Sequence, residues 1–187
     1  MKKFNVPTYY NSNIIERIRA IRNKYDPRKK DISPTIITLG RLTIYIGRHF
    51  GFCYGVKNAI EICYKTIQNY PNKKIYLLSQ MIHNQIVNKD LVDNGISFIL
   101  DTNGNQLIKW EKITKNDIVI IPAFGTSLEI LDILRKKGIN TETFDTTCPF
   151  VSKVWNRSEK IAKEGYTTII YGAAHHEETK STFSRAQ

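Results

Sequence analysis

The chain has 187 residues and a formal net charge of +11, a length that allows one domain or two small α/β lobes. It contains no run of about 18 apolar residues, and its first residues lack the apolar core of a secretory signal. We therefore expect neither a membrane span nor secretion. Its three cysteines include no C-x-x-C pair, which argues against a disulfide framework and favours a reducing compartment.

The positive charge is concentrated near the N-terminus. Residues 1–40 hold nine Lys and Arg against three Asp and Glu, a net of +6. The chain is also rich in Lys, Asn and Ile, as an A/T-biased coding sequence would produce, and its basic residues are not interleaved with aromatic ones in a stripe. We therefore expect no specific nucleic-acid partner, although a basic RNA-binding α/β protein is the alternative that the charge alone would suggest.

Residues 1–40 are predicted to form an N-terminal arm with a helical stretch over 13–24 and breakers at Pro27 and Pro34. From Leu42 onward, apolar runs alternate with segments of helical periodicity. We expect strands at 42–47, 74–79, 96–100, 117–123, 141–145 and 167–171, and helices at 56–69, 84–94, 127–137 and 149–164. This alternation predicts an α/β protein with repeated βα lobes and mainly parallel sheets, divided into a first lobe at 41–103 and a second at 104–187.

Cys53 and Cys148 occupy equivalent places, each between a predicted strand and a predicted helix. A thiol at a helix N-terminus meets exposed N–H groups and the positive end of the helix dipole, which stabilise the thiolate that a metal or cluster requires. Either cysteine alone could equally be a small buried hydrophobic residue. Cys63 lies well inside the following helix, about 15 Å from Cys53 at 1.5 Å per residue, so we expect it in the core.

Two histidines follow predicted strands. His83 follows the second strand, and His176 follows the last, with Glu178 two residues further on. A histidine near a carboxylate can form a proton-transferring pair, although such residues are often only helix caps or surface groups. No closely spaced ligand pairs indicate zinc, and no G-x-G-x-x-G follows a strand to indicate a dinucleotide.

Five motifs together carry a family resemblance: GFCYGVKNAI (51–60), IHNQIVNKDL (82–91), IPAFGTS (121–127), DTTCPFVSKVW (145–155) and HEET (176–179). In this order they resemble 4-hydroxy-3-methylbut-2-enyl diphosphate reductase, the last enzyme of the non-mevalonate isoprenoid pathway. In the PAFG, KVW and HEET motifs the chain resembles the plant and cyanobacterial branch more than other bacterial members.

The resemblance implies a three-lobed α/β fold around a [4Fe–4S] cluster held by three cysteines, of which Cys53 and Cys148 match the first two. It implies that Glu178 delivers a proton, and that His83 and His176 line the substrate pocket. The implied reaction removes the substrate's hydroxyl as water and gives isopentenyl and dimethylallyl diphosphate. Ferredoxin or flavodoxin would supply the electrons, in the cytoplasm of a bacterium or endosymbiont rather than in a plastid stroma.

The sequence departs from the family pattern in two places. Phe124 stands where many bacterial members have a diphosphate-contacting histidine. The family's third lobe, with its third cluster cysteine and its Ser/Asn contacts to the diphosphate, has no counterpart in these 187 residues. We therefore expect an N-terminal fragment that is inactive and cluster-poor by itself. The alternative is a non-catalytic or split-enzyme module of the same fold that needs a partner chain.

Overall fold

The computed structural model describes residues 7, 10 and 12–186. The chain divides into two compact units, Met1–Cys53 and Tyr54–Gln187. This division differs from the one expected, which placed boundaries after residues 40 and 103. The expected boundary at 40 lies inside a β-hairpin of the first unit, and the expected boundary at 103 lies inside the second unit.

The first unit contains α1 (Asn13–Tyr25) and a hairpin of β1 (Thr35–Leu39) and β2 (Leu42–Ile46). The two strands pair antiparallel, with Leu39 opposite Leu42, so that only Gly40 and Arg41 form the turn. Gly40 has a φ of +59°, which fits a turn with glycine at its first central position. The expectation that 42–47 opens the parallel series is therefore wrong, because β2 pairs only with β1 among the described strands.

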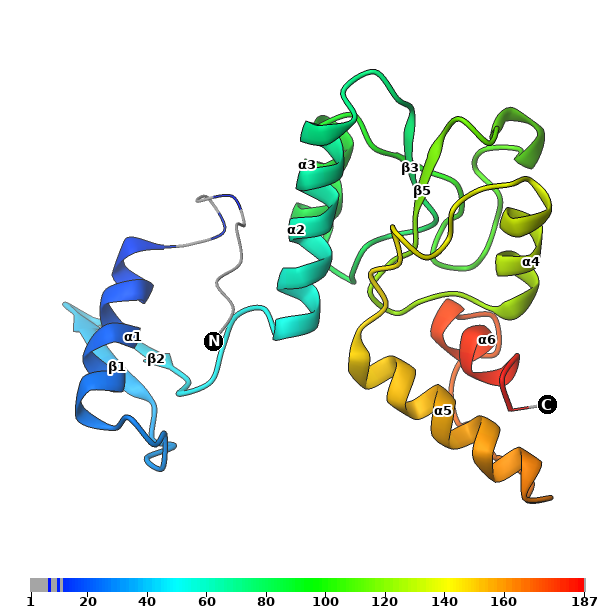
Figure 1. Ribbon diagram of the computed structural model, residues 1–187. Coiled ribbons are helices and arrows are strands. Elements are labelled where there is room, and N and C mark those ends of the chain that lie inside the picture. The colour runs from blue at the N-terminus through cyan, green and yellow to red at the C-terminus, as the bar shows by residue number, and fades with distance from the viewer. Residues whose placement is uncertain (1–6, 8–9, 11, 187) are drawn as a thin grey trace. The chain divides into compact units, whose positions relative to one another are not determined.

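The second unit contains a parallel sheet in the order β4–β3–β5. Figure 1 shows α2 and α3 on one side of this sheet and α4 on the other, the arrangement expected for an α/β protein. In chain order its elements are α2 (Tyr54–Asn69), β3 (Ile75–Leu77), α3 (Gln85–Asp93), β4 (Ser97–Phe98), the 3-10 helix η2 (Trp110–Lys112), β5 (Ile118–Ile120), α4 (Leu128–Lys136), α5 (Pro149–Lys163) and α6 (Glu177–Phe183). Within the described residues, no helix has both the length and the apolar character needed to cross a membrane.

The core of the second unit lies on both faces of the sheet. Tyr76 of β3 and Val119 of β5 are neighbours in the sheet and pack in one buried cluster with Leu134 of α4. Ile60 of α2 and Leu91 of α3 are fully buried as well. Because strands buried on both faces lack a polar alternation, the continuous apolar runs of the sequence correctly predicted β3 and β5.

Three expectations near the C-terminus need correction. The strand expected at 141–145 is reduced to a single parallel bridge between Ile121 and Asp145. The strand expected at 167–171 is not formed, and Ile169 and Tyr171 are 91% and 103% exposed. No helix or strand was expected beyond residue 171, but α6 forms there and lies beside α5 (Figure 1).

Candidate active site

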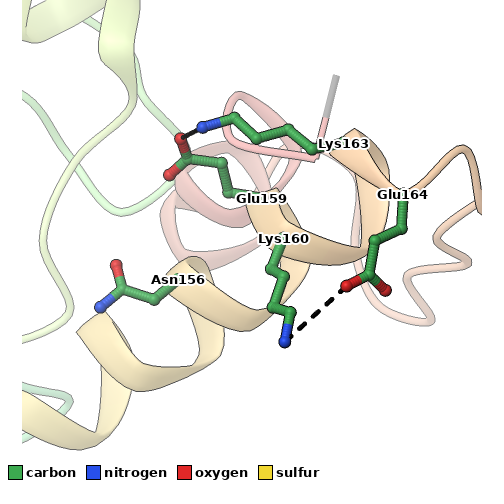
Figure 2. A pocket seen from close by; sticks show the side chains of 5 residues that line it. All are labelled: Asn156, Glu159, Lys160, Lys163 and Glu164. Carbon is green, nitrogen blue, oxygen red and sulfur yellow. Dashed lines mark hydrogen bonds and ion pairs between the residues drawn. The ribbon is translucent and has the colours of Figure 1, made fainter.

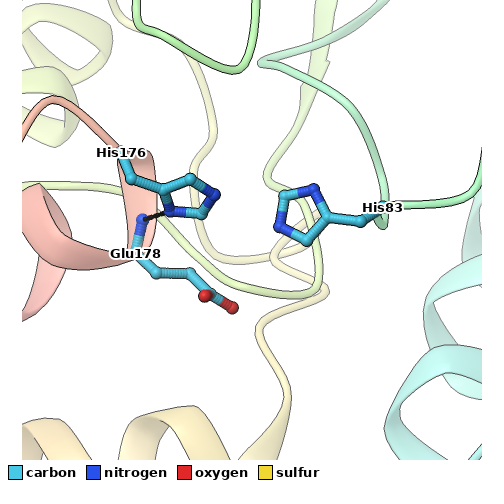
Figure 3. A group of neighbouring side chains, drawn as sticks. All are labelled: His83, His176 and Glu178. Atoms are coloured by element: carbon cyan, nitrogen blue, oxygen red, sulfur yellow. Dashed lines mark hydrogen bonds between the residues drawn. The ribbon is translucent and has the colours of Figure 1, made fainter. Parts of the chain in front are cut away.

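Three of the predicted site residues come together at the carboxyl edge of the parallel sheet. His83, His176 and Glu178 each offer a ligand atom within 4.8 Å of the others. The two imidazole rings have centroids 5.1 Å apart and planes inclined by 52°. Figure 3 shows the side chains of His176 and Glu178, both from the start of α6, pointing toward His83. The fold thus brings together residues that are far apart in the sequence, although only His83 lies on a loop that follows a parallel strand.

The loop that carries His83 is fixed by the helix that follows it. The buried side chain of Asn88, in α3, accepts a hydrogen bond from the N–H of Met81 (3.0 Å) and donates one to the carbonyl of Ile82 (2.8 Å). Asn84 caps α3 by accepting a bond from the N–H of Val87 (3.1 Å). The backbone on both sides of His83 is therefore held while its side chain stays exposed.

The phenyl ring of Phe124 packs against one face of the imidazole of His83. It is 4% exposed, and its ring stacks on that of His83 with centroids 5.3 Å apart and planes at 8°. The sequence identified Phe124 only as a departure from the bacterial pattern. The structure shows that the phenyl ring at this position is a packing surface for a predicted substrate-binding residue.

His176 caps the helix on which Glu178 lies. Its Nδ1 accepts a hydrogen bond from the N–H of Glu178 at 3.2 Å, and α6 begins at the next residue, Glu177. A nitrogen that accepts a bond carries no proton, so the neutral imidazole carries its proton on Nε2. The carboxylate of Glu178 lies in the first turn of α6, where the helix dipole favours negative charge.

Cys148 is the N-cap residue of α5 and precedes Pro149, as the sequence predicted. Its N–H donates to the carbonyl of Ala123 at 2.7 Å, which joins the DTTC and PAFG loops. The side chain lies against the first turn of α2, because a Cβ built on Gly55 would be 2.5 Å from the Cys148 sulfur. Gly55 therefore leaves the space that this half-buried thiol occupies.

Cys53 is the last residue of the first unit and is exposed. The chain just before it is tied to α1, because Arg19 donates a 2.8 Å hydrogen bond to the carbonyl of Phe50 and lies 4.5 Å above the centre of its ring. Gly51 has a φ of +89°, a conformation that favours glycine. Only Tyr54 separates Cys53 from Gly55 in the sequence.

Cys63 is fully buried in α2, and this burial raises the pKa of its thiol. A buried thiol without a stabilising charge is a poor source of thiolate. The prediction that Cys63 belongs to the core is confirmed.

Glu177 was missed by the sequence analysis. Its carboxyl group accepts a hydrogen bond from the buried hydroxyl of Ser79, just beyond β3, and burial raises its pKa to about 7. It lines a pocket of about 130 Å³ together with the side chains of Leu78, Leu100, Thr126, Glu129, Ile130 and Lys180. Nothing in the pattern of HEET distinguishes the first glutamate from an exposed residue of a helix start.

A second hollow lies on the surface of α5 and carries none of the predicted residues (Figure 2). Ion pairs join Lys163 to Glu159 at 2.6 Å and Lys160 to Glu164 at 3.7 Å. Pairs of this spacing are ordinary on an exposed helix face, so we do not consider this hollow a functional site.

Fold and site together define an α/β protein with two histidines and a carboxylate at the carboxyl edge of a parallel sheet. The family described as LytB protein matches residues 44–187. The chain belongs to this family, whose curated relatives are named 4-hydroxy-3-methylbut-2-enyl diphosphate reductase.

Cyanobacterial relatives and a solved structure support the assignment. The reductases of Crocosphaera subtropica and Trichodesmium erythraeum are each 40% identical to the chain, over 96% and 95% of its length, respectively. The structure of the E-1-hydroxy-2-methyl-but-2-enyl-4-diphosphate reductase from Plasmodium falciparum matches with a TM-score of 0.62 and 32% identity, over 73% of this chain and 39% of that one. The chain spans 40% of the length of both cyanobacterial relatives. The predicted family is confirmed.

Proposed function

We propose that this chain forms the substrate-handling part of a 4-hydroxy-3-methylbut-2-enyl diphosphate reductase. The observation that carries the proposal is the convergence of His83, His176 and Glu178, whose ligand atoms lie within 4.8 Å of one another. The identity of the proposed substrate is taken from the names of the cyanobacterial relatives. The proposed reaction consumes two electrons and two protons, breaks the C–O bond of the hydroxyl group and releases water, with isopentenyl and dimethylallyl diphosphate as products.

Each residue of the site has a chemical role in this proposal. Glu178 delivers a proton to the departing hydroxyl group as a general acid, and its carboxyl group lies beside the two imidazoles of the site. His83 and His176 donate hydrogen bonds to the diphosphate or relay protons. A hydrogen bond from His176 to the diphosphate would come from Nε2, because its Nδ1 accepts the N–H of Glu178 in the cap.

Cys53 and Cys148 are proposed as two of the three cysteine ligands of a [4Fe–4S] cluster. The half-buried thiol of Cys148 at a helix N-terminus, facing a glycine, fits the requirements of a cluster ligand. Cys53 fits by its exposure, whereas the fully buried Cys63 does not fit. The third cysteine would come from outside these 187 residues. When bound, such a cluster would supply electrons and a Lewis-acidic iron, and ferredoxin or flavodoxin is the proposed electron donor.

A chimera tests the proposed reaction. The chain would replace the matching 40% of the Crocosphaera subtropica relative, and turnover would be measured anaerobically with a chemical reductant. We expect hydroxyl removal in the chimera and a loss of about 10²- to 10⁴-fold in kcat for Glu178→Gln. The exposed Glu142→Gln is the matched control and should keep full activity. A folded chimera without turnover, or an active Glu178→Gln chimera, would contradict the proposal.

Reconstitution tests the cluster ligands separately. The isolated chain would be incubated anaerobically with iron, sulfide and a small thiol that can complete the ligand set. We expect iron incorporation in the native chain and in Cys63→Ser, and its loss in Cys53→Ser and Cys148→Ser. Equal incorporation in all four proteins would show that the bound iron is not held by the proposed cysteines.

A further inference from the structure

The two ends of α6 are held by different contacts. Near its C-terminal end, Ser184 Oγ accepts a hydrogen bond from the N–H of Leu128 (3.1 Å), and Arg185 donates to the carbonyl of Thr126 (2.8 Å). At its N-terminal end, Ser79 donates to the carboxyl group of Glu177. Across residues 12–186, this is the one hydrogen bond that we find between the first turn of α6 and another element. The turn that carries Glu178 thus depends on one polar contact.

That contact lies in a buried environment. Ser79 is fully buried just beyond the end of β3, and Glu177 is half-buried. The second carboxyl oxygen of Glu177 is buried without a hydrogen-bond partner among the described residues. An unpaired buried oxygen costs free energy, so a gain in stability does not explain why a glutamate occupies this position.

We propose that Glu177 is a positioning residue that, through Ser79, fixes the first turn of α6 and thereby sets His176 and Glu178 against His83. Glu177 lies between the two residues that it positions, and its partner Ser79 belongs to the same strand-to-loop segment that leads to His83. The contact therefore connects the two halves of the site. The proposal rests on the proposed function for the roles of His176 and Glu178, but not for the contact itself.

The charges around Glu177 decide which protonation state of its carboxyl group a substitution must imitate. The groups that act on its carboxyl are Asp101, Glu178 and Lys180, and Glu129 lines the same pocket. Burial and the neighbouring carboxylates outweigh Lys180 and the hydroxyl of Ser79, so that the neutral acid is favoured up to about pH 7. Glutamine is the neutral mimic, because its carbonyl can still accept the hydrogen bond from Ser79.

Amide hydrogen exchange on the isolated chain tests the proposal without substrate, cluster or turnover. We expect the N–H of Glu178, which donates to His176, to exchange at least about tenfold faster in Glu177→Ala and in Ser79→Ala. The amides of Ser184 and Arg185, at the other end of α6, should be unchanged. Glu177→Gln should restore slow exchange, and Glu142→Ala is the surface control.

The nuclear magnetic resonance signals of the histidine rings provide a second readout. A general loss of stability would not reproduce the changes expected in them. The chain has four histidines, so His83 and His176 can be assigned by single substitutions. We expect the signals of both to shift in Glu177→Ala, while those of His49 and His175 stay. The proposal is overturned if Glu178 exchange stays within about twofold of the native chain in both alanine variants, or if the amides of Leu77 and Ile120 in the sheet accelerate by the same factor. Neither result would bear on the cluster or on the chemistry proposed above.

Discussion

The phenyl ring of Phe124 lies parallel to the imidazole of His83, with centroids 5.3 Å apart and planes at 8°. A flat, buried ring below a histidine limits the rotamers of that histidine and keeps its nitrogens directed into the site. Phe124 therefore helps to position a side chain of the proposed substrate site without itself offering a polar group.

Phe124→Leu should remove this support and leave a small cavity. We expect a decrease of about 1 to 2 kcal/mol in the free energy of unfolding, less than for truncation to alanine, and a loss of about three- to tenfold in diphosphate affinity. Urea unfolding and calorimetric titration with the substrate measure the two effects. Phe150→Leu is the matched control because Phe150 is 72% exposed, and it should change neither quantity. Equal effects of both substitutions would contradict the supporting role of the stack.

Gly55→Ala should be destabilising although alanine favours helices. The added methyl group would lie 2.5 Å from the sulfur and 3.1 Å from the Cβ of Cys148. We expect a loss of about 1 to 3 kcal/mol, typical of overpacking, measured by thermal or urea unfolding. Gly47→Ala, whose Cβ would meet its nearest atom at 3.7 Å, is the control.

A double-mutant cycle identifies the source of that loss. In the background Cys148→Ala the sulfur is gone, so Gly55→Ala should cost less than in the native chain. The same cost in both backgrounds would mean that the strain does not arise at the thiol.

Stability should fall with rising pH because of Glu177. Its pKa is about 7 in the folded chain against an ordinary value of 4.5. Between these two values the unfolded chain loses its proton while the folded chain keeps it, so the folded state loses relative stability as pH rises. The effect is complete above pH 7 and amounts to at most about 3 kcal/mol. Urea unfolding from pH 4 to pH 8 should show this decrease in the native chain and a smaller one in Glu177→Gln. An equal decrease in the free energy of unfolding of both proteins would contradict the assignment of this pH dependence to Glu177.

The cysteines should differ in reactivity. Cys53 is exposed and Cys148 is half-buried, whereas Cys63 is fully buried and burial raises the pKa of its thiol. We expect iodoacetamide to label Cys53 and Cys148 in the native chain, and Cys63 at least about 100-fold more slowly, because the thiolate is the reactive form. Peptide mass spectrometry over time measures the three rates, and labelling in urea is the control that should make them similar. Rapid native labelling of Cys63 would contradict its place in the core.

The sequence predicted those elements whose pattern depends on local periodicity. The helical periodicity of residues 56–69 located α2, and Pro149 after Cys148 located the start of α5. It also predicted a core role for Cys63. These predictions succeed because a buried helix face or a helix cap depends on residues that are close together in the sequence.

Pairing between distant segments could not be predicted in the same way. The run 42–46 is as β-rich as a strand of the parallel sheet, but the turn at Gly40 and Arg41 pairs it with β1 instead. The run 167–171 has strand composition without forming a strand. Composition alone does not specify a partner strand. The contact between Ser79 and Glu177 is of the same kind, since neither residue stands out in its own neighbourhood.

The cap formed by His176 makes the two nitrogens of its ring unequal in hydrogen bonding. Nδ1 accepts the N–H of Glu178, so Nε2 is the ring nitrogen left to contact a ligand. In the neutral ring Nε2 carries the hydrogen and can only donate, so a ligand must present an acceptor such as a phosphate oxygen to it. The cap of the helix thus decides which kind of ligand atom this side of the site can bind.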